Sequence, residues 1–89
     1  MVITFRYYMK GKKGTKRSKE YIPQLGARLK QVREAKGYTS YEVFAYEHNI
    51  NRTQYGRYER GEDLRFSTLL RVITALGVTV NEFFEEGFE

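Results

Sequence analysis

The sequence has no cysteine, a single histidine and no long apolar run. Without cysteine, disulfides and thiolate metal sites are excluded, and nothing indicates a secreted, oxidising setting. The apolar runs fall well short of the roughly 20 residues that span a membrane. The start MVITFRYYMK lacks the apolar stretch and cleavage site of a signal peptide. We therefore expect one small cytoplasmic domain with no membrane partner.

Groups that could catalyse a reaction or bind a metal are also missing. His48 has no cysteine and no nearby pair of carboxylates to share a metal ion with, so we expect it to be a half-buried core residue. A pH switch at this residue is the alternative. No nucleophile–base pair or phosphate-binding loop is visible, and 89 residues leave little room for a catalytic pocket. We expect no enzyme activity, no cofactor and no metal.

Positive charge is concentrated at the N-terminus. Residues 1–22 hold seven basic residues and one acidic residue, whereas residues 23–89 hold nine basic and ten acidic residues. This asymmetry predicts a basic arm attached to a near-neutral domain, with the boundary between residues 22 and 23. Within the arm, Val2–Tyr8 could form a short strand that pairs in a dimer, or be loosely ordered, and the stretch KGKKGTKRSK should be a flexible linker. The arm is either a solubilising tail or a contact to nucleic acid through Lys12, Lys13, Lys16 and Arg17.

From Pro23 onward the apolar residues follow a helical period. Pro23 suits the first position of a helix, where its missing N–H costs nothing. The apolar stripe of this first helix consists of Ile22, Leu25, Leu29 and Val32. We expect an all-α bundle of five short helices over residues 23–89.

Local signals predict where the later helices begin and end. Side-chain caps are expected at Ser40, Asn51, Ser67 and Thr79, and helix ends at Gly37, Gly61 and Gly77. Phe66 could form a hydrophobic staple at the start of the fourth helix. Val80, Phe83 and Phe84 should complete the core from the fifth helix.

The segment Ser40–Gly61 carries two short apolar-periodic stretches joined by a break at His48–Asn51. Asn49 lies where the chain must reverse, and asparagine tolerates a positive φ well. Two short helices at a fixed angle, with a polar face turned outward, can place a helix in the major groove of DNA. The pattern predicts a helix-turn-helix DNA-binding domain.

Three stretches carry a family resemblance: LGARLKQVREAKGY, FAYEHNINRTQYGRYERG and LLRVITALGVTVNEFF. Together they resemble the Cro/C1-type helix-turn-helix domain, also called the XRE family. The resemblance implies a lambda-repressor-like bundle of five helices, with a recognition helix at about residues 52–60. The chain departs from the family pattern at Asn49 (usually glycine), His48 (often leucine) and Tyr41 (often a glutamine that contacts a phosphate). A tyrosine hydroxyl can also donate to a phosphate oxygen.

Arg52, at the start of the presumed recognition helix, could bond a guanine through O6 and N7. Thr53 and Arg57 are expected to line the same helix edge as Arg52, although Arg57 could instead pair with a nearby carboxylate at the surface. Gly56 is costly within a helix, so either the backbone comes close to DNA, which we slightly favour, or the glycine packs against another helix. The full set of candidate DNA contacts is Arg52, Thr53, Arg57, Gln54, Gly56, Tyr41, Asn51 and Arg60.

The resemblance assigns Arg33 and Glu59 a structural role. In the family, an arginine near the end of the first helix pairs with a glutamate at the end of the third. Such a pair orients the recognition helix and reads no bases.

Three functions remain open. The first is a sequence-specific transcriptional regulator that binds double-stranded DNA, as a homodimer on two half-sites about one helical turn apart. The second is the antitoxin of a toxin–antitoxin pair, with a toxin covering the end around Phe83–Phe88. The third is a protein-interaction adaptor that keeps the fold without reading DNA.

Overall fold

The computed structural model describes residues 17–89, which form five helices and no strand. The helices are α2 (Ser18–Ala35), α3 (Tyr41–Glu47), α4 (Arg52–Glu59), α5 (Phe66–Leu76) and α6 (Val80–Phe84). The expected all-α, five-helix fold is therefore confirmed for this part of the chain. The proposed strand Val2–Tyr8 and most of the basic arm lie outside the described residues.

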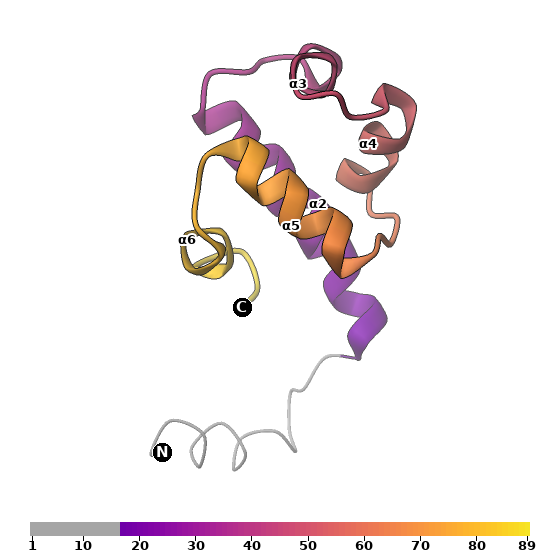
Figure 1. Ribbon diagram of the computed structural model, residues 1–89. Helices are drawn as coiled ribbons and strands as arrows, with labels where there is room; N and C mark the ends of the chain where they lie inside the picture. The colour runs from indigo at the N-terminus through magenta and orange to yellow at the C-terminus, as the bar shows by residue number, and fades with distance from the viewer. Residues whose placement is uncertain (1–16) are drawn as a thin grey trace.

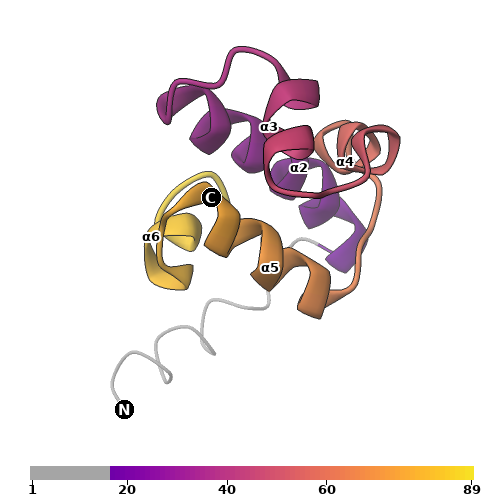
Figure 2. The same cartoon turned by 45° about the horizontal axis from the view of Figure 1, so that its top comes forward.

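Helix α2 runs through the middle of the bundle and the other helices pack around it. Figures 1 and 2 show α5 crossing α2. Helices α3 and α4 lie together on one side of α5, and α6 lies on its other side. The core consists of Leu29, Val32, Phe44, Ala45, Ile50, Tyr55, Tyr58, Leu69, Val72, Ile73, Leu76 and Phe83. Every helix contributes at least one residue to it.

The expected start of the first helix at Pro23 is wrong, because α2 begins five residues earlier, at Ser18. The backbone N–H of Arg17 donates to the Glu20 carboxylate (2.9 Å), which closes the first turn. Pro23 then lies in the second turn, where its ring removes one backbone bond and does not end the helix. The prediction treated proline as a start signal, but proline is also tolerated this close to a start.

Three of the four expected side-chain caps are present. Ser40 Oγ, Asn51 Oδ1 and Thr79 Oγ1 each accept an N–H from the first turn of the helix that follows. The expected cap at Ser67 is wrong, because α5 begins at Phe66 and its N-cap is Arg65, without a side-chain bond. The staple at Phe66 is also wrong, since 62% of this side chain is exposed.

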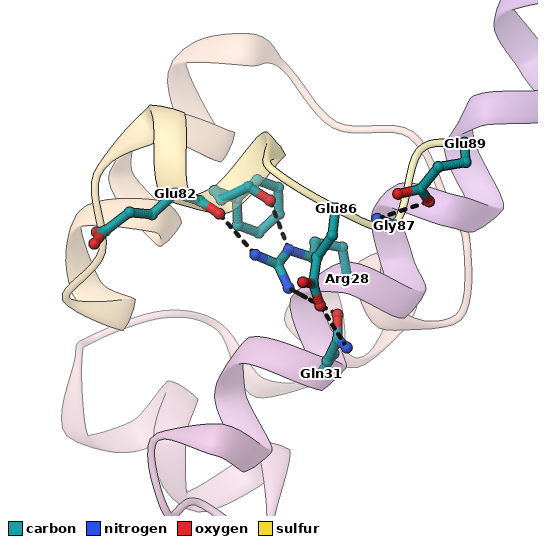
Figure 3. A network of polar contacts seen from close by, with 7 residues as sticks. Arg28, Gln31, Glu82, Glu86, Gly87 and Glu89 are labelled. Carbon is teal, nitrogen blue, oxygen red and sulfur yellow. Dashed lines mark hydrogen bonds and ion pairs between the residues drawn. The ribbon is translucent and has the colours of Figure 1, made fainter.

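Helix α6 is held on α2 by Arg28 (Figure 3). The Arg28 Nε and Nη2 donate to the carbonyl oxygens of Phe83 (2.6 Å) and Glu82 (2.7 Å), and Nη1 lies 3.4 Å from the Glu86 carboxylate. A guanidinium at this end of a helix satisfies carbonyls that have no partner within the helix. Of the apolar residues expected from α6, Phe83 is buried, but Val80 and Phe84 are 42% and 40% exposed, so their placement in the core was wrong.

Candidate nucleic-acid interface

A tight turn fixes the angle between α3 and α4. Asn49 has a φ of 57°, as its position in the sequence predicts, and the next N–H, of Ile50, donates to the Ala45 carbonyl (2.8 Å). The Ile50 side chain is buried, and Asn51 Oδ1 accepts the Gln54 N–H (2.8 Å) to begin α4. The turn is therefore closed by backbone bonds on one side and by a cap on the other.

Helix α4 is also held against α2 at very short range. A β-carbon built on Gly26 would lie 2.6 Å from the Tyr58 carbonyl oxygen and 2.7 Å from the Glu59 carbonyl oxygen. No side chain fits in that space, so only glycine lets the two backbones approach this closely. Gly26 could not be singled out from the sequence, because a close approach between two helices leaves no local pattern.

The expected Arg33–Glu59 pair joins the same two helices. Arg33 Nε and Nη2 donate to the two Glu59 carboxylate oxygens at 2.7 and 2.9 Å, and Nη1 donates to the Tyr38 carbonyl (2.7 Å). Both side chains are almost fully buried. The hydrogen bonds that Arg33 donates to the Glu59 carboxylate raise the pKa of Arg33 above its ordinary value. The pair fixes the C-terminal end of α4 and is turned away from solvent.

Gly56 is explained by packing inside the bundle. It is buried, and a β-carbon at this position would lie 2.8 Å from Cε1 of Tyr41. Of the two explanations for Gly56, the structure therefore supports packing against another helix over the favoured close approach to DNA, because the glycine makes room for the Tyr41 ring between α3 and α4. Tyr41 is half-buried, so its ring is first of all a packing contact.

The exposed face of α4 is arranged differently from the expected single edge. Successive residues of an α-helix are turned by about 100°, so Arg52 and Arg57 lie about 140° apart, whereas Thr53 and Arg57 are about 40° apart. All three side chains are exposed. Thr53 and Arg57 share the centre of the outer face, and Arg52 lies on its border toward α3. The prediction that all three residues line one edge of the helix is therefore wrong for Arg52.

Two surface hollows flank this outer face of α4, which we call the ridge. The first, of about 390 Å³ on the α3 side, is lined by Ser40, Glu42, Val43, Tyr46 and Arg52. The second, of about 590 Å³ between α4 and α5, is lined by Gln54, Arg57, Tyr58, Glu62, Asp63, Leu64, Arg65, Thr68 and Arg71. We call this second one the α4–α5 hollow. Its Arg65 and Arg71 could not be identified from the sequence, because only the fold brings them beside α4.

A rigidly held helix with an exposed, cationic ridge is what a major-groove reader requires, and the comparison with protein families agrees. The family described as "Helix-turn-helix domain" matches residues 24–83. The chain belongs to the helix-turn-helix domain family. This family is associated with XRE-type DNA-binding domains. Searches of curated proteins and of solved structures gave no match.

The other predicted contacts of the helix-turn-helix domain are solvent-accessible. Gln54, Arg60 and Arg17 are exposed, and so is Asn51, although its Oδ1 is engaged in capping α4. Lys12, Lys13 and Lys16 lie outside the described residues. His48 is half-buried as expected, with its Nε2 3.4 Å from the Tyr38 hydroxyl and its ring against Phe44.

The described part of the helix-turn-helix chain contains no cluster of three metal-ligating side chains. None of its helices over residues 17–89 is both long and apolar enough to cross a membrane.

Proposed function

We propose that this helix-turn-helix protein is a sequence-specific transcriptional regulator of the XRE type that binds double-stranded DNA with α4 in the major groove. The observation that carries the proposal is the outer face of α4. It exposes Thr53 and Arg57 at its centre and Arg52 at its border, while the Arg33–Glu59 pair holds its other side. A regulator acting on DNA belongs in the cytoplasm, and families of this kind are typically non-enzymatic.

Base reading is assigned to the two arginines and the threonine. Each arginine can donate two hydrogen bonds to O6 and N7 of a guanine, which discriminates against a wrong base by roughly 1–3 kcal/mol. The Thr53 methyl can contact a thymine methyl. Because Arg52 and Arg57 point about 140° apart, they should contact different base pairs or different strands.

Positioning is assigned to polar groups around the ridge. Asn51 Nδ2, Gln54 and Arg60 can donate to bases or phosphates at the ends of α4, and the Tyr41 hydroxyl can donate to a phosphate. Lys12, Lys13, Lys16 and Arg17 of the basic arm would add phosphate contacts that strengthen binding without reading sequence.

We further propose a homodimer on two half-sites separated by about one helical turn. An antitoxin role is the second candidate, and it is favoured by one observation. Phe84, which is 40% exposed, lies with its ring tilted against that of Phe88 (5.1 Å between centroids), and the two form an aromatic surface that a toxin could cover. A protein-interaction adaptor that keeps the fold without the DNA contacts is the third.

Selection of bound sequences from a random duplex library tests the proposal directly. The parent protein should enrich a defined motif, and Arg52→Ala together with Arg57→Ala should abolish that enrichment while thermal unfolding stays unchanged, because both side chains are exposed. Lys36→Ala is the control: it also removes positive charge, at the opposite end of α2 from Ser18. A parent protein that enriches no motif would refute the regulator and favour the adaptor.

A further inference from the structure

The α4–α5 hollow is lined by three arginines that form no ion pair with another described residue. Arg57, Arg65 and Arg71 line it from α4, from the connecting loop and from α5. The three guanidinium groups form no hydrogen bond or ion pair with any other residue of the range 17–89. Two carboxylates, Glu62 and Asp63, also line the hollow and offset part of this charge, and Asp63 Oδ1 accepts the Leu64 N–H (2.8 Å). The lining therefore keeps a small excess of positive charge.

The start of α5 faces the same hollow and adds backbone donors. Its N-cap residue, Arg65, makes no side-chain cap, its first turn has no acidic residue, and Thr68 of that turn lines the hollow. In contrast, α3, α4 and α6 each begin with a side-chain acceptor. Unpaired N–H groups at the start of a helix favour an anion.

The dimensions of DNA relate this hollow to the proposed function. A helix with its side chains is about 10–12 Å across, and the major groove is about 12 Å wide. A helix that fills the groove must therefore have one sugar-phosphate backbone directly on each side. The two hollows beside α4 are the surfaces that these backbones would meet, and three arginines lie on the α5 side.

The start of α2 lies next to this surface. A β-carbon on Gly61, just after α4, would lie 3.5 Å from Pro23 Cα, and a neighbouring hollow is lined by residues 18, 19, 22, 23, 61 and 63. Asp63 lines both hollows. Because α2 begins at Ser18, six residues before the family match, its first turn places Lys19 on the hollow beside the α4–α5 hollow.

We propose that the α4–α5 hollow binds the phosphodiester backbone of the DNA strand on the α5 side of the recognition helix, with Arg65 and Arg71 as its phosphate contacts. The proposal rests on the proposed function and deepens it. It assigns affinity to two arginines outside α4 and leaves base reading to Arg52, Thr53 and Arg57.

The test is the salt dependence of binding for the full chain, on its selected duplex and on a scrambled duplex of equal length. Each phosphate contact contributes about 0.9 to the slope of log K against log salt. Arg65→Gln and Arg71→Gln should each lower the slope by about 0.9, and the double variant by about 1.8. Affinity for both duplexes should fall by the same factor. Lys36→Gln, with the same loss of charge near Gly77 at the far end of α5, should leave the slope unchanged.

An unchanged slope in the Arg65→Gln and Arg71→Gln variants would overturn the phosphate site while leaving the regulator intact. So would the same decrease in Lys36→Gln, since the effect would then be one of overall charge. Loss of affinity for the selected duplex alone would overturn the assignment by showing that these arginines read bases. If the parent protein does not distinguish the two duplexes, the proposed function itself fails. Both arginines are exposed, and circular dichroism checks that the variants remain folded.

Discussion

Gly26→Ala should destabilise the protein, although alanine is the better helix former. In an exposed helix the change would stabilise by about 1 kcal/mol. Here the new β-carbon would lie 2.6 and 2.7 Å from two backbone carbonyl oxygens of α4, and 3.0 Å from the Glu59 carbonyl carbon. Carbon atoms pack best at about 3.5–4.0 Å, so α2 and α4 must move apart by roughly an ångström. Neither backbone can rotate out of the way, as a flexible side chain could.

Overpacking of this kind typically costs about 1–3 kcal/mol, and the better helix propensity offsets about 1 kcal/mol of that. The separation also strains the Arg33–Glu59 bonds, so we expect a net loss of about 1–2 kcal/mol in the free energy of unfolding. For a domain of this size, each kcal/mol lowers the Tm by roughly 4–8 °C. Thermal and urea unfolding, followed by circular dichroism, measure both quantities.

Gly56→Ala is the matched comparison, because it adds the same methyl group to a helix. Its β-carbon would meet the Tyr41 ring at 2.8 Å, a side chain that can shift. We therefore expect a smaller loss of stability than for Gly26→Ala. If Gly26→Ala were as stable as the parent protein, or more stable than Gly56→Ala, the close approach of α2 and α4 would not explain the glycine.

Three further predictions concern single side chains. Arg33→Met should lower the free energy of unfolding by about 3–5 kcal/mol, because it leaves the Glu59 carboxylate buried without its partner. Adding Glu59→Leu should recover much of that loss, as measured by urea unfolding. A double variant as unstable as Arg33→Met would contradict the explanation by a stranded charge. Tyr55→Phe should be neutral or stabilise by up to about 1 kcal/mol, since the buried hydroxyl forms no hydrogen bond of good geometry among the described residues, although burial and the nearby Glu59 carboxylate raise its pKa. A loss above about 1 kcal/mol would show that the hydroxyl does bond Glu59. The Thr79 N–H and hydroxyl lower the pKa of Glu82, so this carboxylate stabilises α6 at neutral pH and loses that effect as the pH falls through the lowered pKa. Glu82→Gln should therefore make the Tm less dependent on pH in the acid range. An unchanged dependence of Tm on pH would refute this role of Glu82.

Features with a local cause could be predicted from the sequence. The caps at Ser40 and Asn51 depend on one side chain and the N–H groups two or three residues later. The positive φ of Asn49 depends on that residue and its place between two helices. The Arg33–Glu59 pair was predicted through the family resemblance, since the two residues are 26 positions apart and no local pattern connects them.

Features that depend on contacts between distant segments could not be predicted in this way. Gly26 matters because of the α4 backbone, and Arg28 because α6 places its carbonyl oxygens beside α2. Ser67 carries a good capping hydroxyl, yet α5 begins before it and its first turn instead faces the α4–α5 hollow. A residue that looks like a local signal can therefore be overruled by what lies next to it in the fold.

The assignment of the recognition surface changed for a geometric reason. Arg52 and Arg57 are five residues apart, and a five-residue step on a helix turns by about 140°, so one edge cannot present both. The structure places them at two different hollows, the first beside α3 and the second beside α5. If α4 lies in a groove whose two walls are phosphate backbones, the arginine on each side is close to one strand. Thr53 and Arg57, which share the centre of the outer face, then face the bases most directly, and Arg52 reaches base edges from the border beside α3.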